Sequence, residues 1–145
     1  MLNFKKYLLQ AQSFSNFQAT ALLLLRVVVG VAFILHGSPK IQSPMAWMPE
    51  TAGLPGILQL LAAVSEFGGG IAILFGLLTR VASLGLGFTM IVATAMHAFV
   101  MKDPFVNMTG GSSYELALGY AVIALLFLAM GPGQYSLDKK LFGER

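Results

Sequence analysis

The chain has 145 residues, of which 57% are hydrophobic and only 10% charged, and its formal net charge is +3 at pH 7. A soluble domain carries roughly 25% charged residues, so this composition excludes an ordinary water-soluble fold, and the mean hydropathy of +0.77 indicates a membrane protein. The basic residues lie at the ends of apolar runs and form no stripe, which argues against nucleic-acid binding. The sequence has no cysteine, which excludes disulfides, cysteine-held metal centres and thiol relays within this chain.

The first 18 residues differ from the rest of the chain. Lys5 and Lys6 are followed by an amphipathic segment, residues 7–18, instead of a continuous apolar stretch. This pattern predicts an N-terminal amphipathic helix over residues 1–18 that lies at the membrane interface. A disordered tail is the alternative interpretation.

Four apolar stretches follow, at about residues 19–36, 54–78, 81–101 and 113–130. A helix needs about 20 residues to cross ~30 Å of hydrocarbon, with ~17 as the lower limit. None of the stretches alternates polar and apolar residues as a barrel strand would. The sequence therefore predicts an all-α fold, a transmembrane four-helix bundle in a single domain spanning residues 1–145.

The connections support four helices. Residues 36–53 form a longer loop with three prolines and Trp47, while Thr79-Arg80 forms a tight hairpin between the second and third helices. Gly131-Pro132-Gly133 is a strong stop for the fourth helix.

The distribution of basic residues predicts the orientation. Six of them are expected on one side of the bilayer and two on the other, and the side richer in lysine and arginine faces the cytoplasm. The sequence thus predicts a multi-pass protein with both termini cytoplasmic. The six are Lys5, Lys6, Arg80, Lys139, Lys140 and Arg145, and the two are Lys40 and Lys102.

Two charged residues fall deep inside the predicted bundle. Glu66 lies near the middle of the second helix and Arg26 lies ~8 Å deeper at 1.5 Å per residue. A charge at the bilayer centre costs about 2.5–3.5 kcal/mol on insertion scales. We therefore expect Arg26 and Glu66 to pair, either as structural glue between two helices or as part of a site.

The predicted outer half collects the other ionisable residues. His36, Lys40, His97 and Glu115 all fall towards the loops at 36–53 and 102–113. For Glu115 and His97, a solvated helix end is a simpler explanation than a site, and His36 and Lys40 in the mouth of the bundle are weaker candidates. Two histidines and a carboxylate on different helices are a weak metal signal, so no metal site and no haem is predicted.

Several short motifs, taken in their order along the chain, are similar to those of a known family. They are Arg26 with Gly30, His36-Gly37-Ser38-Pro39-Lys40, Glu66-Phe67-Gly68-Gly69-Gly70, Gly76-Leu77-Leu78-Thr79-Arg80, Tyr114-Glu115-Leu116, and Gly131-Pro132-Gly133-Gln134-Tyr135-Ser136-Leu137-Asp138. With these motifs the chain resembles the DoxX family of small bacterial membrane proteins from about residue 19 to residue 138. The resemblance implies a four-helix protein of the bacterial inner membrane and a component of a membrane oxidoreductase.

That resemblance leads to a redox hypothesis. An outward-facing polar cavity would bind a quinone or another small redox-active molecule, with Glu66, His97 and Glu115 as catalytic proton carriers. Arg26, His36, Lys40 and Tyr114 are the candidate binding residues. No intrinsic cofactor is expected, so electron transfer would need the quinone or a partner oxidoreductase subunit. Whether the chain is itself an enzyme or only a subunit of one stays open.

The alternative hypothesis is a non-catalytic role. The bundle would then bind a small molecule or lipid, or anchor a partner enzyme in the bilayer. A proton-coupled transporter is less well supported, because four helices give no inverted pair of broken helices unless the chain forms a homodimer.

Overall fold

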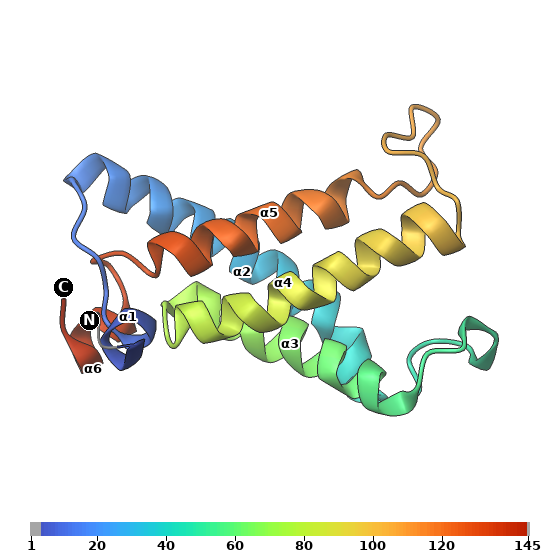
Figure 1. Cartoon of the computed structure of the whole chain (residues 1–145), viewed down its shortest axis with the longest axis horizontal. Coiled ribbons are helices and arrows are strands. Elements are labelled where there is room, and N and C mark those ends of the chain that lie inside the picture. Colours follow the sequence, from blue (N-terminus) through green and yellow to red (C-terminus); the bar gives the residue numbers. More distant parts are fainter. Residues whose placement is uncertain (1–3, 145) are drawn as a thin grey trace.

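A computed structural model describes residues 4–144, and over that range its elements are all helical (Figure 1). The prediction of an all-α bundle is confirmed. Residues 1–3 of the predicted amphipathic segment and Arg145 of the basic set lie outside the described residues.

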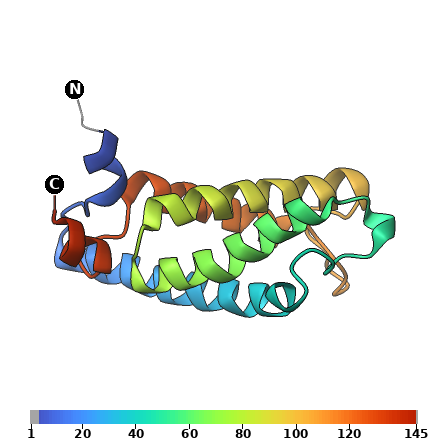
Figure 2. The same ribbon diagram turned by 90° about the horizontal axis from the view of Figure 1, so that it is seen from below.

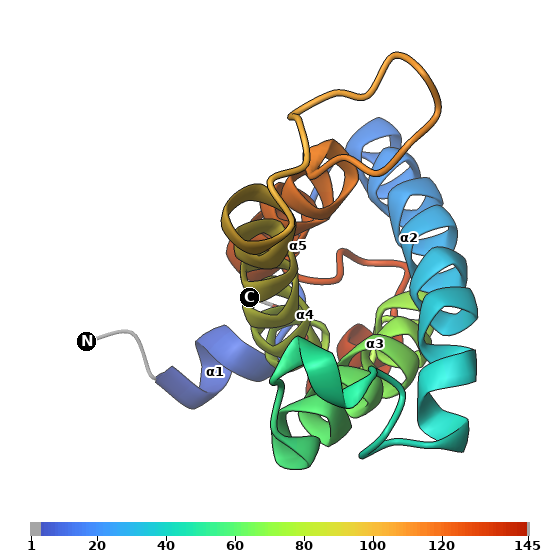
Figure 3. The same ribbon diagram turned by 90° about the vertical axis from the view of Figure 1, so that its right-hand side faces the viewer.

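Four long helices make up the body of the molecule. They are α2 (Asn16–Gln42), α3 (Gly56–Phe75), α4 (Thr79–Ala95), which continues as a π-helical turn over Met96–Val100, and α5 (Glu115–Met130). Within the described residues, three helical stretches are long and apolar enough to cross a membrane, and α5, with 16 residues, is a shorter apolar helix. Seen along the bundle, α2, α3, α4 and α5 follow one another around a ring (Figure 3).

The two ends of the bundle are different. The first and last described residues lie at one end, which we call the terminal end, with α1 (Phe4–Leu9), α6 (Leu137–Phe142) and the turn between α3 and α4 (Figures 1 and 2). The connections 43–55 and 101–114 lie at the opposite, loop end. The cytoplasmic location of the termini stays a prediction.

The N-terminal segment is less helical than predicted. Helix α1 has only six residues, and α2 starts at Asn16 because Ser15 and Gln18 form a reciprocal capping box. Between the two helices, the amide of Ala11 donates to the carbonyl of Gly143 at 3.1 Å. Hydrogen bonds from Ser13 and Lys139 hold the pKa of the neighbouring Glu144 carboxyl below its usual range. These contacts hold the two chain ends together.

Helix α2 is longer than predicted at its loop end. The sequence predicts its end near residue 36, but the helix continues through Gly37 and Pro39 to Gln42. A proline removes one backbone hydrogen bond from a helix, and membrane helices tolerate this where neighbouring groups compensate. The extension places Lys40 on a helix that faces α3 instead of in a loop.

Glycines set the spacing of α2 and α3. A Cβ on Gly37 would lie 2.4 Å from the backbone nitrogen of Phe67, and one on Gly30 would lie 2.8 Å from that of Leu74. Only glycine permits so close an approach of two helix backbones. The same register brings the middle of α2 beside Gly70 of α3.

The predicted hairpin between α3 and α4 is displaced by three residues. Gly76 ends α3 in the left-handed conformation with φ of 65°, and Thr79 and Arg80 already belong to the first turn of α4. Both side chains are completely buried. The turn therefore spans residues 76–78, and the residues that follow it are buried at the end of the bundle.

Most large apolar side chains on the outside of the bundle are exposed, as a lipid-facing surface requires. Leu24, Val28, Phe88 and Leu125 each expose more than 60% of their surface. The inside is filled by a cluster from all four helices: Leu22, Val29, Phe33, Ile73, Leu86, Met90, Ala124 and Phe127.

Candidate functional site

The structure overturns the predicted pairing of Arg26 with Glu66. Arg26 is 1% exposed, and its guanidinium donates to the carbonyls of Ile73, Leu74, Pro132 and Tyr135 at 2.8–3.0 Å. The first two carbonyls belong to the last turn of α3, where helix carbonyls lack intrahelical partners. Arg26 therefore ties the end of α3 to the segment that follows α5.

Arg80 acts in the same way at the end of α5. Its guanidinium donates to the carbonyls of Leu128 and Met130 at 3.1 Å and to that of Gln10 at 2.9 Å. Asp138 completes the terminal end, since its carboxylate accepts from the amides of Leu78 and Thr79 at 2.6 and 3.0 Å. The motif residues 131–138 thus have a clear structural role.

Glu66 pairs with Lys40 instead. The Lys40 ammonium lies 2.6 and 2.7 Å from the two carboxylate oxygens of Glu66, and it lies 4.5 Å from the centre of the Trp47 ring. The side chain of Glu66 is 3% exposed and that of Lys40 is 23% exposed. The pair is neutral as a whole, which lowers the cost of placing two charges in a bundle of this kind.

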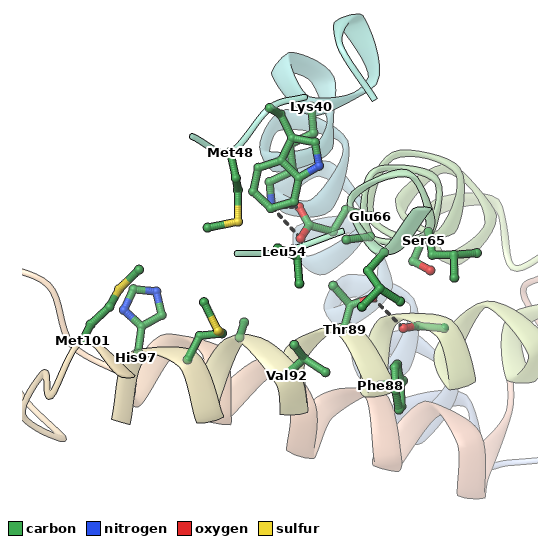
Figure 4. Close-up of a pocket in the computed structure, with 17 residues that line it drawn as sticks. Lys40, Met48, Leu54, Ser65, Glu66, Phe88, Thr89, Val92, His97 and Met101 are labelled. Atoms are coloured by element: carbon green, nitrogen blue, oxygen red, sulfur yellow. Dashed lines mark hydrogen bonds and ion pairs between the residues drawn. The ribbon is translucent and has the colours of Figure 1, made fainter. Parts of the chain in front are cut away.

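A cavity of about 550 Å³ opens beside this ion pair, between α3 and α4. Most of its wall is apolar, with a few polar groups from Lys40, Glu66, Ser65, Thr89 and His97 (Figure 4). Ligand pockets in proteins have this size and this mixture of apolar wall and few polar groups.

His97 lies across the cavity from the ion pair, on the π-helical turn that extends α4 (Figure 4). Its Nδ1 lies 2.7 Å from a carboxylate oxygen of Asp103, and the amide of Asp103 donates to the carbonyl of His97. Single π-helical turns within α-helices are frequent at functional sites. The cavity thus has a carboxylate–ammonium pair on one wall and a histidine–carboxylate pair on another.

The other predicted site residues lie outside this cavity. Glu115 is exposed and lies along a separate, more open groove of about 460 Å³ on α5, together with Tyr120. Tyr114 packs its ring against Phe105, with 5.3 Å between the ring centres. His36 is exposed on α2. The structure therefore brings together Glu66, His97 and Lys40, but not Glu115, His36, Tyr114 or Arg26.

Three residues that line the site or support its lining residues were not predicted as site residues. Gln59 is 6% exposed; its carbonyl accepts from the indole of Trp47, and its side chain accepts from the amide of Met48, both at 2.9 Å. Trp47, the single tryptophan, was predicted only as part of the loop over residues 36–53. Asp103 follows His97 by six residues, a spacing that does not place two side chains on the same face of a helix. A polar residue in the first turn of an apolar helix was the one available signal for Gln59.

Among the described residues, no three histidine, aspartate or glutamate side chains gather as a metal site would need.

Comparisons with known proteins agree with this architecture. The DoxX family model matches residues 21–101. The Escherichia coli protein named "Inner membrane protein YqjF" is 34% identical over 125 residues, which cover 82% of this chain and 90% of that protein. The Bacillus subtilis protein named "Putative oxidoreductase CatD" is 33% identical over 115 residues, which cover 76% of this chain and 84% of that protein.

An uncharacterized membrane protein of Mycobacterium tuberculosis is 33% identical over 130 residues, with 81% of this chain and 78% of that protein covered. No solved structure matches the chain. The matched region contains most of α2 and all of α3 and α4, and with them Lys40, Glu66 and His97. The chain is a bacterial-type inner membrane protein and belongs to the DoxX family.

Proposed function

We propose that the cavity between α3 and α4 binds a quinone head group, and that the chain serves as the quinone-binding membrane subunit of an oxidoreductase. The observation that carries this proposal is that Glu66, paired with Lys40, and His97, bonded to Asp103, lie on separate walls of one largely apolar cavity. A relative of this chain is named as an oxidoreductase, which supports the same class of function.

The cavity suits a flat apolar ring that has oxygen atoms at opposite edges. Its volume of about 550 Å³ lies within the range of about 300–1,000 Å³ for small-molecule sites. The Lys40 ammonium is a hydrogen-bond donor, and His97 offers a ring nitrogen that is not bonded to Asp103. The two together can orient a ring between them.

The proton chemistry fits the residue types. Reduction of a bound quinone takes two electrons and two protons. Glu66 and His97 each carry a titratable group at the cavity wall, and groups of this kind transfer protons when they lie within hydrogen-bond reach. Asp103 is 19% exposed, so it can connect His97 with water at the loop end. The electrons come from a partner subunit, since the chain has no cysteine to hold a redox centre.

Two single substitutions test this proposal. Glu66→Gln and His97→Gln should each lower quinone-linked electron transfer in membranes by at least about 100-fold, the lower end of the typical contribution of a positioned proton donor or acceptor. Glu50→Gln, an exposed carboxylate at the loop end that does not line the cavity, is the matched control. Equal activity of Glu66→Gln, His97→Gln and the control, at equal folded amounts in the membrane, would remove the redox role.

A non-catalytic anchoring role is the second candidate. Two observations favour it. In both ion pairs the charged groups bind each other, and Arg26 and Arg80 bind the carbonyls at the ends of α3 and α5. In that case the charge-removing variants would lower folded yield and leave the partner's turnover per assembled complex unchanged. Purification from native membranes would then give a stoichiometric partner or a lipid in place of a quinone.

A further inference from the structure

The cavity wall continues onto the outer surface of the bundle. Leu58 and Leu61 of α3 and Phe88 and Val92 of α4 all line the cavity, yet they expose between 38% and 68% of their surface. A side chain that lines a cavity and is also exposed lies at its rim. Because these four residues are apolar and lie within two membrane-spanning helices, this rim faces the hydrocarbon.

The loop end of the cavity is covered instead. Trp47, Met48 and Leu54 line the cavity from the connection between α2 and α3, and Gln59 fastens this connection with three hydrogen bonds of 2.9 Å. The Lys40 ammonium below the Trp47 ring adds a fourth contact. The connection is therefore held across the end of the cavity that faces away from the hydrocarbon.

The geometry points to a ligand that comes from the bilayer. We propose that this cavity takes a quinone with a long isoprenoid tail, which enters between α3 and α4 and leaves its tail in the lipid past Leu61 and Val92. The inference rests on the proposed function, and it adds the class of substrate: a lipid-dissolved, tailed quinone in place of a water-soluble redox molecule.

The polar groups set the depth at which the head group stops. Lys40 and Glu66 lie at the inner wall and His97 lies towards the loop end (Figure 4), whereas the exposed rim residues are all apolar. A ligand with a polar head and an apolar tail matches both regions, because its tail packs against the apolar side chains of the rim as it leaves the cavity. A small polar molecule would match the inner wall only.

The single tryptophan gives a direct measurement. Trp47 lies at the cavity, so a bound quinone should quench its fluorescence. Ubiquinone with its full isoprenoid tail is compared with the same benzoquinone head group without the tail, in vesicles that contain the purified chain. Concentrations are corrected for the measured partition of each compound into the lipid.

Two double variants test whether the tail of the bound quinone passes between α3 and α4. Leu61→Phe with Val92→Phe adds bulk at the rim without adding an indole, and Leu84→Phe with Val122→Phe makes the same change at exposed residues that do not line the cavity. All four positions face lipid, so folding should tolerate the changes.

The expected result is a midpoint of quenching about tenfold lower for the tailed quinone than for the bare head group. The rim variant should raise the midpoint of the tailed quinone by about tenfold and leave that of the bare head group unchanged, while the control variant changes neither. Equal midpoints for both compounds, or no effect of the rim variant, would overturn the lateral entry and leave the head-group site standing. No quenching by either compound would overturn the proposed function itself.

Discussion

The Lys40 ammonium contacts both carboxylate oxygens of Glu66, at 2.6 and 2.7 Å, and so joins the loop-end part of α2 to the middle of α3. The contact exists because α2 continues as a helix through Pro39 and because Gly37 allows it to lie directly against Phe67. Trp47 covers the ammonium from the other side. A charge pair in this position can stabilise the bundle, serve the cavity, or do both.

Single and double substitutions separate these roles. Lys40→Met leaves a carboxylate that is 3% exposed without its partner and should lower the free energy of unfolding by about 3–5 kcal/mol. The double variant Lys40→Met with Glu66→Met should recover most of this loss, because a neutral apolar pair needs no compensation. Thermal unfolding in detergent measures stability, and quenching of Trp47 measures quinone binding.

The proposed function requires that binding does not recover with stability. A double variant that regains both stability and quinone binding would show that Lys40 and Glu66 serve the fold alone.

Arg26 should matter for stability at the terminal end. Arg26→Met removes the donor for four carbonyl groups and should cost about 3–5 kcal/mol, since buried carbonyls lose charge-assisted hydrogen bonds. Arg26→Lys keeps the charge but cannot reproduce the planar guanidinium, so we expect an intermediate loss. The check is the unfolding midpoint in detergent, together with proteolysis of residues 131–144. Equal stability of Arg26→Met and the unmodified chain would contradict this role.

The apolar pattern of the sequence was sufficient to predict the bundle but not its contacts. The stretches at 19–36, 54–78, 81–101 and 113–130 correspond to α2, α3, α4 and α5, because length and apolar character alone decide which segments enter a bilayer. The depth of Arg26 and Glu66 suggested a pair, yet depth says nothing about the rotation of a helix. The guanidinium of Arg26 instead donates to backbone carbonyls, two of which belong to the segment after α5.

The candidate site shows the same limit. Lys40 was predicted in a loop, and its approach to Glu66 depended on a helix that passes a proline, against the usual preference of that residue. Glu115 was predicted in the outer half together with His97, and it does lie at the loop end, but on α5 and along the other groove. Residue type alone singled out Glu66 and His97, and both line one cavity in the structure. Which wall each residue occupies required the packing of the helices.

Asp138 should behave as the cap of α4. Its carboxylate accepts from the amides of Leu78 and Thr79, and the side chain is completely buried. Asp138→Ala should lower the free energy of unfolding by about 2 kcal/mol, the upper end for loss of a cap residue. Hydrogen exchange of the two amides reports the effect locally, and it should increase more than the exchange of amides in the middle of α4. Glu144→Ala, at an exposed carboxylate, is the control and should leave these two amides protected.

Gly37 and Gly68 form a matched pair that tests the close contact of α2 and α3. A Cβ on Gly37 would lie 2.4 Å from the nitrogen and 2.7 Å from the Cα of Phe67, whereas one on Gly68 would meet nothing within 4 Å. Gly37→Ala should therefore force the helices apart and cost about 1–3 kcal/mol, as overpacking does.

Gly68→Ala should be neutral or stabilise the protein by up to about 1 kcal/mol, because alanine is the better helix former. Separation of the helices in Gly37→Ala also moves Lys40 away from Glu66, so quinone binding should weaken in this variant and not in Gly68→Ala. Unfolding midpoints and quenching of Trp47, measured on the same samples, connect the two effects. Equal stability of Gly37→Ala and Gly68→Ala would show that α2 and α3 do not depend on backbone contact at Gly37.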